Sequence, residues 1–166
     1  LVESTLKALP AILTGSASIK DILFLNKSNG NVAEISENSL QSDYFNQIIA
    51  QTIVAKLESV KLNQPHLPLR IFEIGAGTGE TSKIVLEALR PYHDRIETYV
   101  YTDTSKTYLA YGEERYKRES PFLTTTLFDV EKPLSSQNIL SGTYDIVIAA
   151  NILYATKNIK NTLCNA

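Results

Sequence analysis

The chain has 166 residues, of which 43 % are hydrophobic and 20 % are charged. This balance is typical of one folded domain with a buried core, and it excludes a collagen-like or wholly disordered chain. A net charge of −2 and the lack of a basic stripe in the sequence argue against a nucleic-acid-binding protein.

Several simple sites and signals are not expected from this sequence. The one cysteine, Cys164, excludes an intrachain disulfide and a cysteine-based metal cage, while His66 and His93 lie outside metal-ligand spacing. No apolar run reaches the ~18 residues of a transmembrane helix, and the N-terminus lacks a signal-peptide pattern. Because methionine is absent and both ends look cut, we expect a piece of a larger cytoplasmic protein, with no metal site and no membrane contact.

Residues 1–66 are predicted to be mainly helical. Apolar side chains at helical spacing predict a helix around residues 6–13 and a longer one over about 44–60, with Asp43 as its N-cap. Pro65 and Pro68 then interrupt the chain, because proline lacks a backbone donor and disfavours helix in the residue before it. We therefore expect one region over 1–66 and a second over 67–166.

From residue 69 onward, predicted strands alternate with predicted helices. The strands are expected at 69–74, 96–102, 122–128 and 144–150, and the helices at 80–89 and 105–118. This alternation is typical of a parallel sheet in an α/β domain. The last strand is apolar enough to lie between two covered faces, and without a further neighbour it would leave an exposed apolar edge.

A glycine-rich turn, with Gly75, Gly77 and Gly79, joins the first predicted strand to the helix that follows. Glycines allow a tight turn and close approach of a ligand, and the free N–H groups of the helix point into the same crevice. A dinucleotide fingerprint does not fit, because Glu80 stands where its third glycine would fall, and no Walker lysine follows. S-adenosylmethionine fits, because its cationic groups would lie near the carboxylate of Glu73. The alternative interpretation is a tight turn between strand and helix that binds no ligand.

Polar residues also end the other predicted strands. Asp103 ends the second strand, where it could accept hydrogen bonds from two ribose hydroxyls or simply begin a turn. Asp129 ends the third strand, where it could accept from an adenine amino group or serve as an N-cap or loop residue. Asn151 ends the fourth. Since ligands bind at the carboxyl edge of open α/β sheets, the four strand ends together favour a ligand site there.

Residues 69–81 (Leu-Arg-Ile-Phe-Glu-Ile-Gly-Ala-Gly-Thr-Gly-Glu-Thr) resemble motif I of class I S-adenosylmethionine-dependent methyltransferases. Stretches at 21–24, 42–46 and 144–156 resemble the C-methyltransferase domains of polyketide synthases and of hybrid polyketide–peptide megasynthases. The last of them, with Ala-Ala-Asn-Ile-Leu-Tyr-Ala-Thr, carries the narrower resemblance, which covers essentially the whole chain.

The resemblance implies an α/β fold with a Rossmann-like core. We expect the first four strands of a parallel sheet, in the order 3-2-1-4, preceded by a helical lid over 1–66. Residues 67–166 would form the first half of the S-adenosylmethionine-binding domain. Because the family's sheet has seven strands, the chain is expected to be truncated.

The resemblance also implies an activity and a set of site residues. The methyl group of S-adenosylmethionine would move to the α-carbon of a β-ketoacyl chain held by an acyl carrier protein, among neighbouring megasynthase domains. Glu73 and the glycines would surround the methionine moiety, Asp103 would hold the ribose, Asp129 and Val130 would bracket the adenine, and Asn151 would line the floor. The implied cofactor-binding residues are Glu73, Gly75, Ala76, Gly77, Gly79, Asp103, Thr104, Asp129, Val130 and Asn151.

No catalytic residue is assigned from the sequence. The family's His/Glu base pair belongs to the part beyond this chain, and Tyr154 stands where the family often has histidine, although tyrosine is a poor base near neutral pH. The alternatives are a catalytically inactive pseudo-methyltransferase module, an O- or N-methyltransferase and, more distantly, a nicotinamide oxidoreductase.

Overall fold

The computed structural model describes residues 2–17, 40–63 and 67–166, and the chain divides into two compact units, Leu1–Leu40 and Gln41–Ala166. In the first unit the structure describes helix α1 (Val2–Leu13), which confirms the helix predicted around residues 6–13. Residues 21–24, Pro65 and His66 lie outside the described residues. Among the described helices, none is long and apolar enough to cross a membrane.

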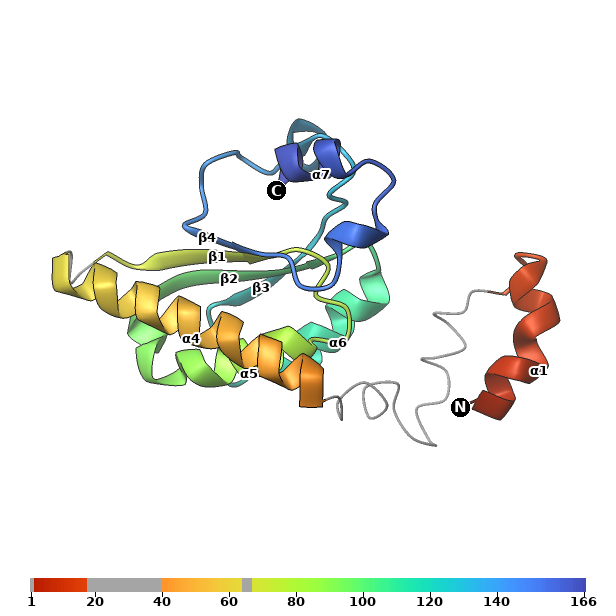
Figure 1. Cartoon of the computed structure of the whole chain (residues 1–166), viewed down its shortest axis with the longest axis horizontal. Coiled ribbons are helices and arrows are strands. Elements are labelled where there is room, and N and C mark those ends of the chain that lie inside the picture. The colour runs from red at the N-terminus through yellow and green to blue at the C-terminus, as the bar shows by residue number, and fades with distance from the viewer. Residues whose placement is uncertain (1, 18–39, 64–66) are drawn as a thin grey trace. The chain divides into compact units, whose positions relative to one another are not determined.

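The second unit is built around a sheet of four parallel strands (Figure 1). These strands are β1 (Leu69–Glu73), β2 (Ile96–Asp103), β3 (Leu123–Leu127) and β4 (Ile146–Ile148). Their order is β3-β2-β1-β4, which confirms the predicted 3-2-1-4 arrangement and the α/β fold class. In the register, Phe72 of β1 pairs with Val100 of β2 on one side and with Val147 of β4 on the other.

The longer helices of this unit are α4 (Leu40–Asn63), α5 (Glu80–Leu89) and α6 (Lys106–Tyr116). Helices α4 and α5 lie together along one side of the sheet in Figure 1. The core on this side joins Leu57 of α4, Val85 of α5 and Ile71 of β1, all at most 1 % exposed. Helix α4, which belongs to the region predicted over 1–66, thus shares a core with the sheet.

A second, smaller core lies on the other face of the sheet. The ring of Phe72 packs edge-on against Phe128, with centroids 5.1 Å apart, and lies 4.7 Å from the ring of Tyr144. Short elements complete the unit, and α7 lies on this side in Figure 1. They are η1 (Arg90–Arg95), η2 (Leu134–Gln137), η3 (Leu153–Ala155) and α7 (Ile159–Asn165).

Two local predictions are wrong in detail. Asp43 is not an N-cap but lies in the first turn of α4, where its carboxylate suits the positive end of the helix dipole. The fourth strand has three residues, and Val147 in its middle is 43 % exposed, so it is not covered on both faces. Among the described strands β4 pairs only with β1, and an edge strand with one neighbour has less to bury it.

Candidate functional site

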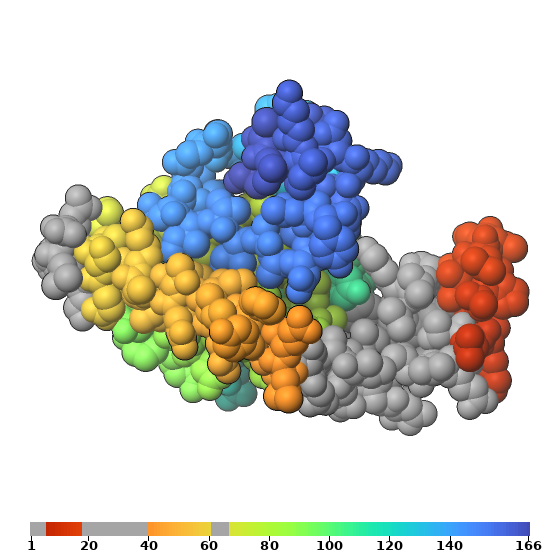
Figure 2. Space-filling view, in the orientation of Figure 1, coloured from red at the N-terminus to blue at the C-terminus, as the bar shows by residue number. Residues whose placement is uncertain are grey.

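The loops after β1, β2 and β3 meet at the carboxyl edge of the sheet, around a cavity of about 120 Å³. Five of the predicted cofactor-binding residues line it: Gly75, Asp103, Thr104, Asp129 and Val130. Segment η3 forms part of the wall, and Figure 2 shows the C-terminal part of the chain, in blue, above helix α4, in orange and yellow. The structure therefore brings together predicted site residues that lie far apart in the sequence.

The turn after β1 places its glycines in the left-handed region of backbone conformation. Gly75 has φ +63°, and a Cβ there would lie 2.6 Å from Cγ1 of Ile152, so the backbone passes directly beneath that side chain. Gly77 has φ +58°, but the nearest atom to a Cβ would be the oxygen of Gly75 at 4.0 Å. The space beside Gly77 is thus open to a ligand, whereas Gly75 is required for packing.

Asp103 is 7 % exposed, lines the cavity and is held by two backbone groups. Its Oδ2 accepts from the N–H of Gly77 at 3.1 Å, and its Oδ1 accepts from the N–H of Ser105 at 2.8 Å. A carboxylate offers about four acceptor positions, so two remain for hydroxyl donors of a ligand. Asp103 thus begins a turn and also lines the cavity, and its ribose-binding role stays a prediction.

Asp129 is half-buried, and the side chain of Gln137 holds its backbone through two hydrogen bonds. The amide of Gln137 accepts from the N–H of Asp129 at 2.7 Å and donates to its carbonyl at 2.9 Å. The carboxylate accepts from the N–H of Glu131 at 3.0 Å and lies 3.2 Å from Nζ of Lys132. Asp129 therefore has the contacts of a loop aspartate, and it also lines the cavity next to the buried Val130.

Contrary to the expectation from the sequence, the side chain of Glu73 does not line the cavity. It is 2 % exposed, and its Oε2 accepts from Oγ of Ser82 at 2.5 Å and from the hydroxyl of Tyr99 at 2.6 Å. Side chains alternate between the faces of a strand, so Glu73 shares the face of Ile71 and points toward α5. Its carboxylate lies behind the turn, within the layer between the sheet and the helices.

Other predicted residues lie near the cavity without lining it. Ala76, Gly77 and Gly79 belong to the turn, and the N–H of Ala76 donates to the carbonyl of Thr102 at 2.8 Å. Asn151 is exposed with φ +53°, and the next residue, Ile152, lines the cavity in its place. The sequence analysis missed Ile152, although it lies within the stretch 144–156 that carries the family resemblance.

Replacing Glu73 by glutamine is expected to change how stability depends on pH. Burial raises the pKa of Glu73 above 4.5, against the opposing effect of its hydrogen bonds from Ser82 and Tyr99. With the folded-state pKa above the unfolded one, the carboxyl's contribution is fully present below pH 4.5 and is lost as the pH rises through the folded-state pKa. Glutamine is neutral and keeps one acceptor oxygen, so Glu73→Gln should become more stable relative to the wild type across that window.

Urea unfolding of both proteins, from about pH 4 to pH 8, measures this difference. The exposed Glu114→Gln, on α6, is the control for removing one negative charge. A free-energy difference between Glu73→Gln and wild type that stays constant with pH would contradict the burial argument.

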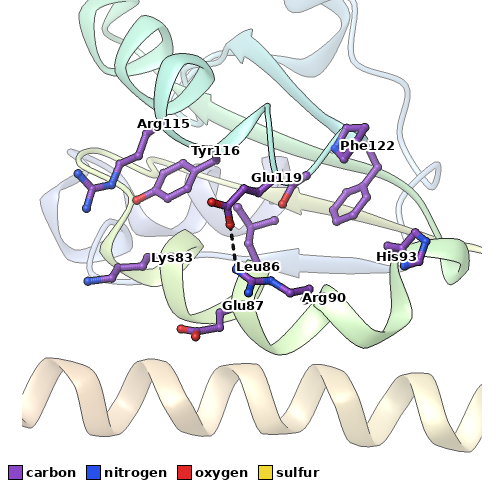
Figure 3. Close-up of a pocket in the computed structure, with 11 residues that line it drawn as sticks. Lys83, Leu86, Glu87, Arg90, His93, Arg115, Tyr116, Glu119 and Phe122 are labelled. Carbon is purple, nitrogen blue, oxygen red and sulfur yellow. Dashed lines mark hydrogen bonds and ion pairs between the residues drawn. The ribbon is translucent and has the colours of Figure 1, made fainter.

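A larger cavity of about 600 Å³ lies between α5 and the α6–β3 segment (Figure 3). Arg90 and Glu119, which line it, form an ion pair of 2.8 Å, and both side chains are about two-thirds exposed. His93 and Phe122 also line it, and none of the predicted site residues does. In the described part of the chain, no group of three His, Cys, Asp or Glu residues could hold a metal ion.

Comparisons with known proteins identify the protein family to which the chain belongs. A family model described as a methyltransferase domain matches residues 72–166. The chain belongs to this methyltransferase-domain family, as the resemblance predicted.

The chain is similar to segments of polyketide synthases and to solved carbon methyltransferases. Polyketide synthase PksR of Bacillus subtilis is 49 % identical over 166 residues, which are 100 % of this chain and 6 % of PksR. The solved structure of CurJ carbon methyltransferase superposes with a TM-score of 0.82 at 29 % identity, over 98 % of this chain and 42 % of that one. A structure of trans-methyltransferase CalH in complex with SAH gives a TM-score of 0.69 at 25 % identity, over 98 % and 42 %.

The chain is thus a methyltransferase domain homologous to the C-methyltransferase domains of polyketide synthases. It spans about two fifths of these solved structures and a small part of the curated relative.

Proposed function

We propose that the chain forms the cofactor-binding part of a carbon methyltransferase that acts in polyketide biosynthesis. The observation that carries this proposal is that Gly75, Asp103, Thr104, Asp129 and Val130 line one cavity at the carboxyl edge of the sheet. In this proposal residues 1–66 form a helical region and 67–166 the first half of the cofactor-binding domain.

The cavity residues suit S-adenosylmethionine, which supplies an electrophilic methyl group on a sulfonium centre. Asp103 would accept from the ribose hydroxyls with its two remaining acceptor positions, and Asp129 and Val130 would bracket the adenine. The open space beside Gly77 admits the methionine portion against the backbone. A volume of about 120 Å³ is below the usual range for whole-ligand pockets, so the cavity suits one portion of the cofactor.

Glu73 would act from behind the turn in this arrangement. Its carboxylate is bonded to Ser82 and Tyr99, which ties β1 to α5 and β2 just before the glycine turn. It would therefore support the shape of the turn rather than contact the cofactor's cation.

For the substrate, we propose the α-carbon of a β-ketoacyl chain tethered to an acyl carrier protein. A carbon nucleophile forms only when a general base removes the α-proton. We assign that role to none of the described residues, since His93 lines the other cavity and Tyr154 is 82 % exposed. The homology to CurJ carbon methyltransferase and to PksR supports carbon methylation within a polyketide synthase.

Calorimetric titration of the chain with S-adenosylmethionine and, separately, with NADH tests the cofactor assignment. We expect saturable binding of S-adenosylmethionine alone, because the glycine spacing does not suit a dinucleotide. Binding of neither compound would favour a structural module, and binding of NADH would overturn the assignment. In the full-length protein, transfer of label to a hydroxyl or an amine in place of the α-carbon would reject the carbon-methylation proposal.

A further inference from the structure

Two tyrosine hydroxyls reach the glycine turn from outside the cavity. Tyr101, on β2, donates to the carbonyl of Gly77 at 2.6 Å. Tyr116, the last residue of α6, donates to the carbonyl of Gly79 at 3.0 Å. Both carbonyls belong to residues with positive φ, which lie in the segment proposed to receive the cofactor.

These bonds fix the orientation of the peptide groups around Gly77. Its N–H donates to Oδ2 of Asp103 at 3.1 Å, while its carbonyl accepts from Tyr101. The N–H of Gly79 donates to the carbonyl of Ala76 at 2.9 Å, and its own carbonyl accepts from Tyr116. Without the hydroxyls, glycine residues could rotate these carbonyls toward other directions at little steric cost.

Two glycines make room for the two rings. A Cβ on Gly112 would lie 2.7 Å from Cζ of Tyr101, and a Cβ on Gly79 would lie 2.7 Å from Cε2 of Tyr116. Gly112 lies inside α6, where glycine is a poor helix former. Its place there is explained by the ring it admits, so α6 is shaped to let Tyr101 reach the turn.

The rings of Tyr101 and Tyr116 lie next to each other beside the turn. Their centroids are 6.4 Å apart, and Tyr116 also forms part of the wall of the larger cavity (Figure 3). Burial raises the pKa of Tyr101 far above its ordinary value, so its hydroxyl remains a donor at neutral and moderately alkaline pH. A turn held in advance loses less conformational freedom when a ligand binds, which favours affinity.

We propose that Tyr101 and Tyr116 are positioning residues, which hold the glycine turn in the conformation that binds the cofactor by fixing the carbonyls of Gly77 and Gly79. The effect on affinity rests on the proposed function, because it requires that the turn binds S-adenosylmethionine. The effect on the turn itself does not, since the two hydrogen bonds join groups of this chain only.

The test compares Tyr101→Phe, Tyr116→Phe and the double variant with Tyr92→Phe. Tyr92 is a matched control, because its hydroxyl is hydrogen-bonded to Glu58 on α4. Calorimetry should show that each variant at the turn weakens S-adenosylmethionine binding about two- to tenfold, as expected for one hydrogen bond. The double variant should lose more, and Tyr92→Phe should bind like the wild type.

Hydrogen exchange of the turn amides, without any ligand, gives a readout independent of the cofactor. We expect the amides of Gly77 and Gly79 to exchange faster in Tyr101→Phe and Tyr116→Phe than in Tyr92→Phe at equal global stability. Unchanged exchange and unchanged affinity would overturn the proposal, as would equal affinity losses in Tyr92→Phe. If the wild type itself fails to bind S-adenosylmethionine, the proposed function fails, and faster exchange alone would still support the positioning role.

Discussion

Gly77→Asp is expected to abolish binding of S-adenosylmethionine while the domain stays folded. A side chain at this position has open space, and aspartate tolerates the φ of +58° better than most residues. The new carboxylate would lie close to Asp103, whose Oδ2 accepts from the N–H of residue 77 at 3.1 Å. In the free protein water screens the two carboxylates, but a bound ligand would exclude that water and leave like charges unpaired next to each other, so affinity should fall by about a hundredfold or more.

Calorimetric titration measures the affinity, and circular dichroism with thermal unfolding checks the fold. Gly77→Asn is the matched control, since asparagine has nearly the same shape, tolerates positive φ and carries no charge. We expect it to retain much more affinity than Gly77→Asp. If Gly77→Asp binds S-adenosylmethionine with wild-type affinity, the assignment of the turn to the cofactor site is wrong. Gly75→Ala should behave differently, because its Cβ would meet Ile152 at 2.6 Å and disturb the packing itself.

Asp103→Ala is expected to weaken S-adenosylmethionine binding by about 1.5–3 kcal/mol, which is roughly 10- to 150-fold. The variant removes the acceptors proposed for the ribose hydroxyls, and it also releases the N–H groups of Gly77 and Ser105. Both effects act on the same cavity, so the loss should appear mainly in affinity.

Asp145→Ala is the control for this change. Oδ2 of Asp145 accepts from the N–H of Arg70 at 2.8 Å, near the opposite end of β1. The control therefore loses a comparable bond between a carboxylate and a backbone N–H, but away from the cavity. Equal affinity in the two variants would contradict the assignment of Asp103 to the cofactor.

Much of the fold could be predicted from the sequence, because the signals are local. Alternating strand and helix patterns from residue 69 gave the parallel sheet, and α5 begins and ends where its periodicity and Pro91 predict. The spacing of the glycines and the acidic residues at the strand ends identified Gly75, Asp103 and Asp129, which line one cavity, and the family resemblance added Thr104 and Val130. Parallel strands bring their carboxyl ends to one edge, so these residues meet wherever the strands pair in this order.

The face of the sheet on which the Glu73 side chain lies could not be predicted in this way. The strand of Glu73 carries apolar side chains on both faces, and such a pattern does not say which face of the sheet meets the helices. The structure decides this by pairing and packing, since Ile71 and Glu73 face α5 while Phe72 faces the smaller core. A carboxylate expected at the ligand thus became a buried group bonded to Ser82 and Tyr99.

The sequence by itself determined where the turn lies and which residue types surround it. Only the tertiary structure decided how the turn is held, because its partners are distant along the chain: Tyr101 bonds to Gly77 across 24 residues and Tyr116 to Gly79 across 37. The closeness of Ile152 to Gly75 is likewise a product of packing between β1 and the segment after β4. Periodicity and propensity act over a few residues, whereas these contacts exist only after the strands have paired and α6 has packed against them.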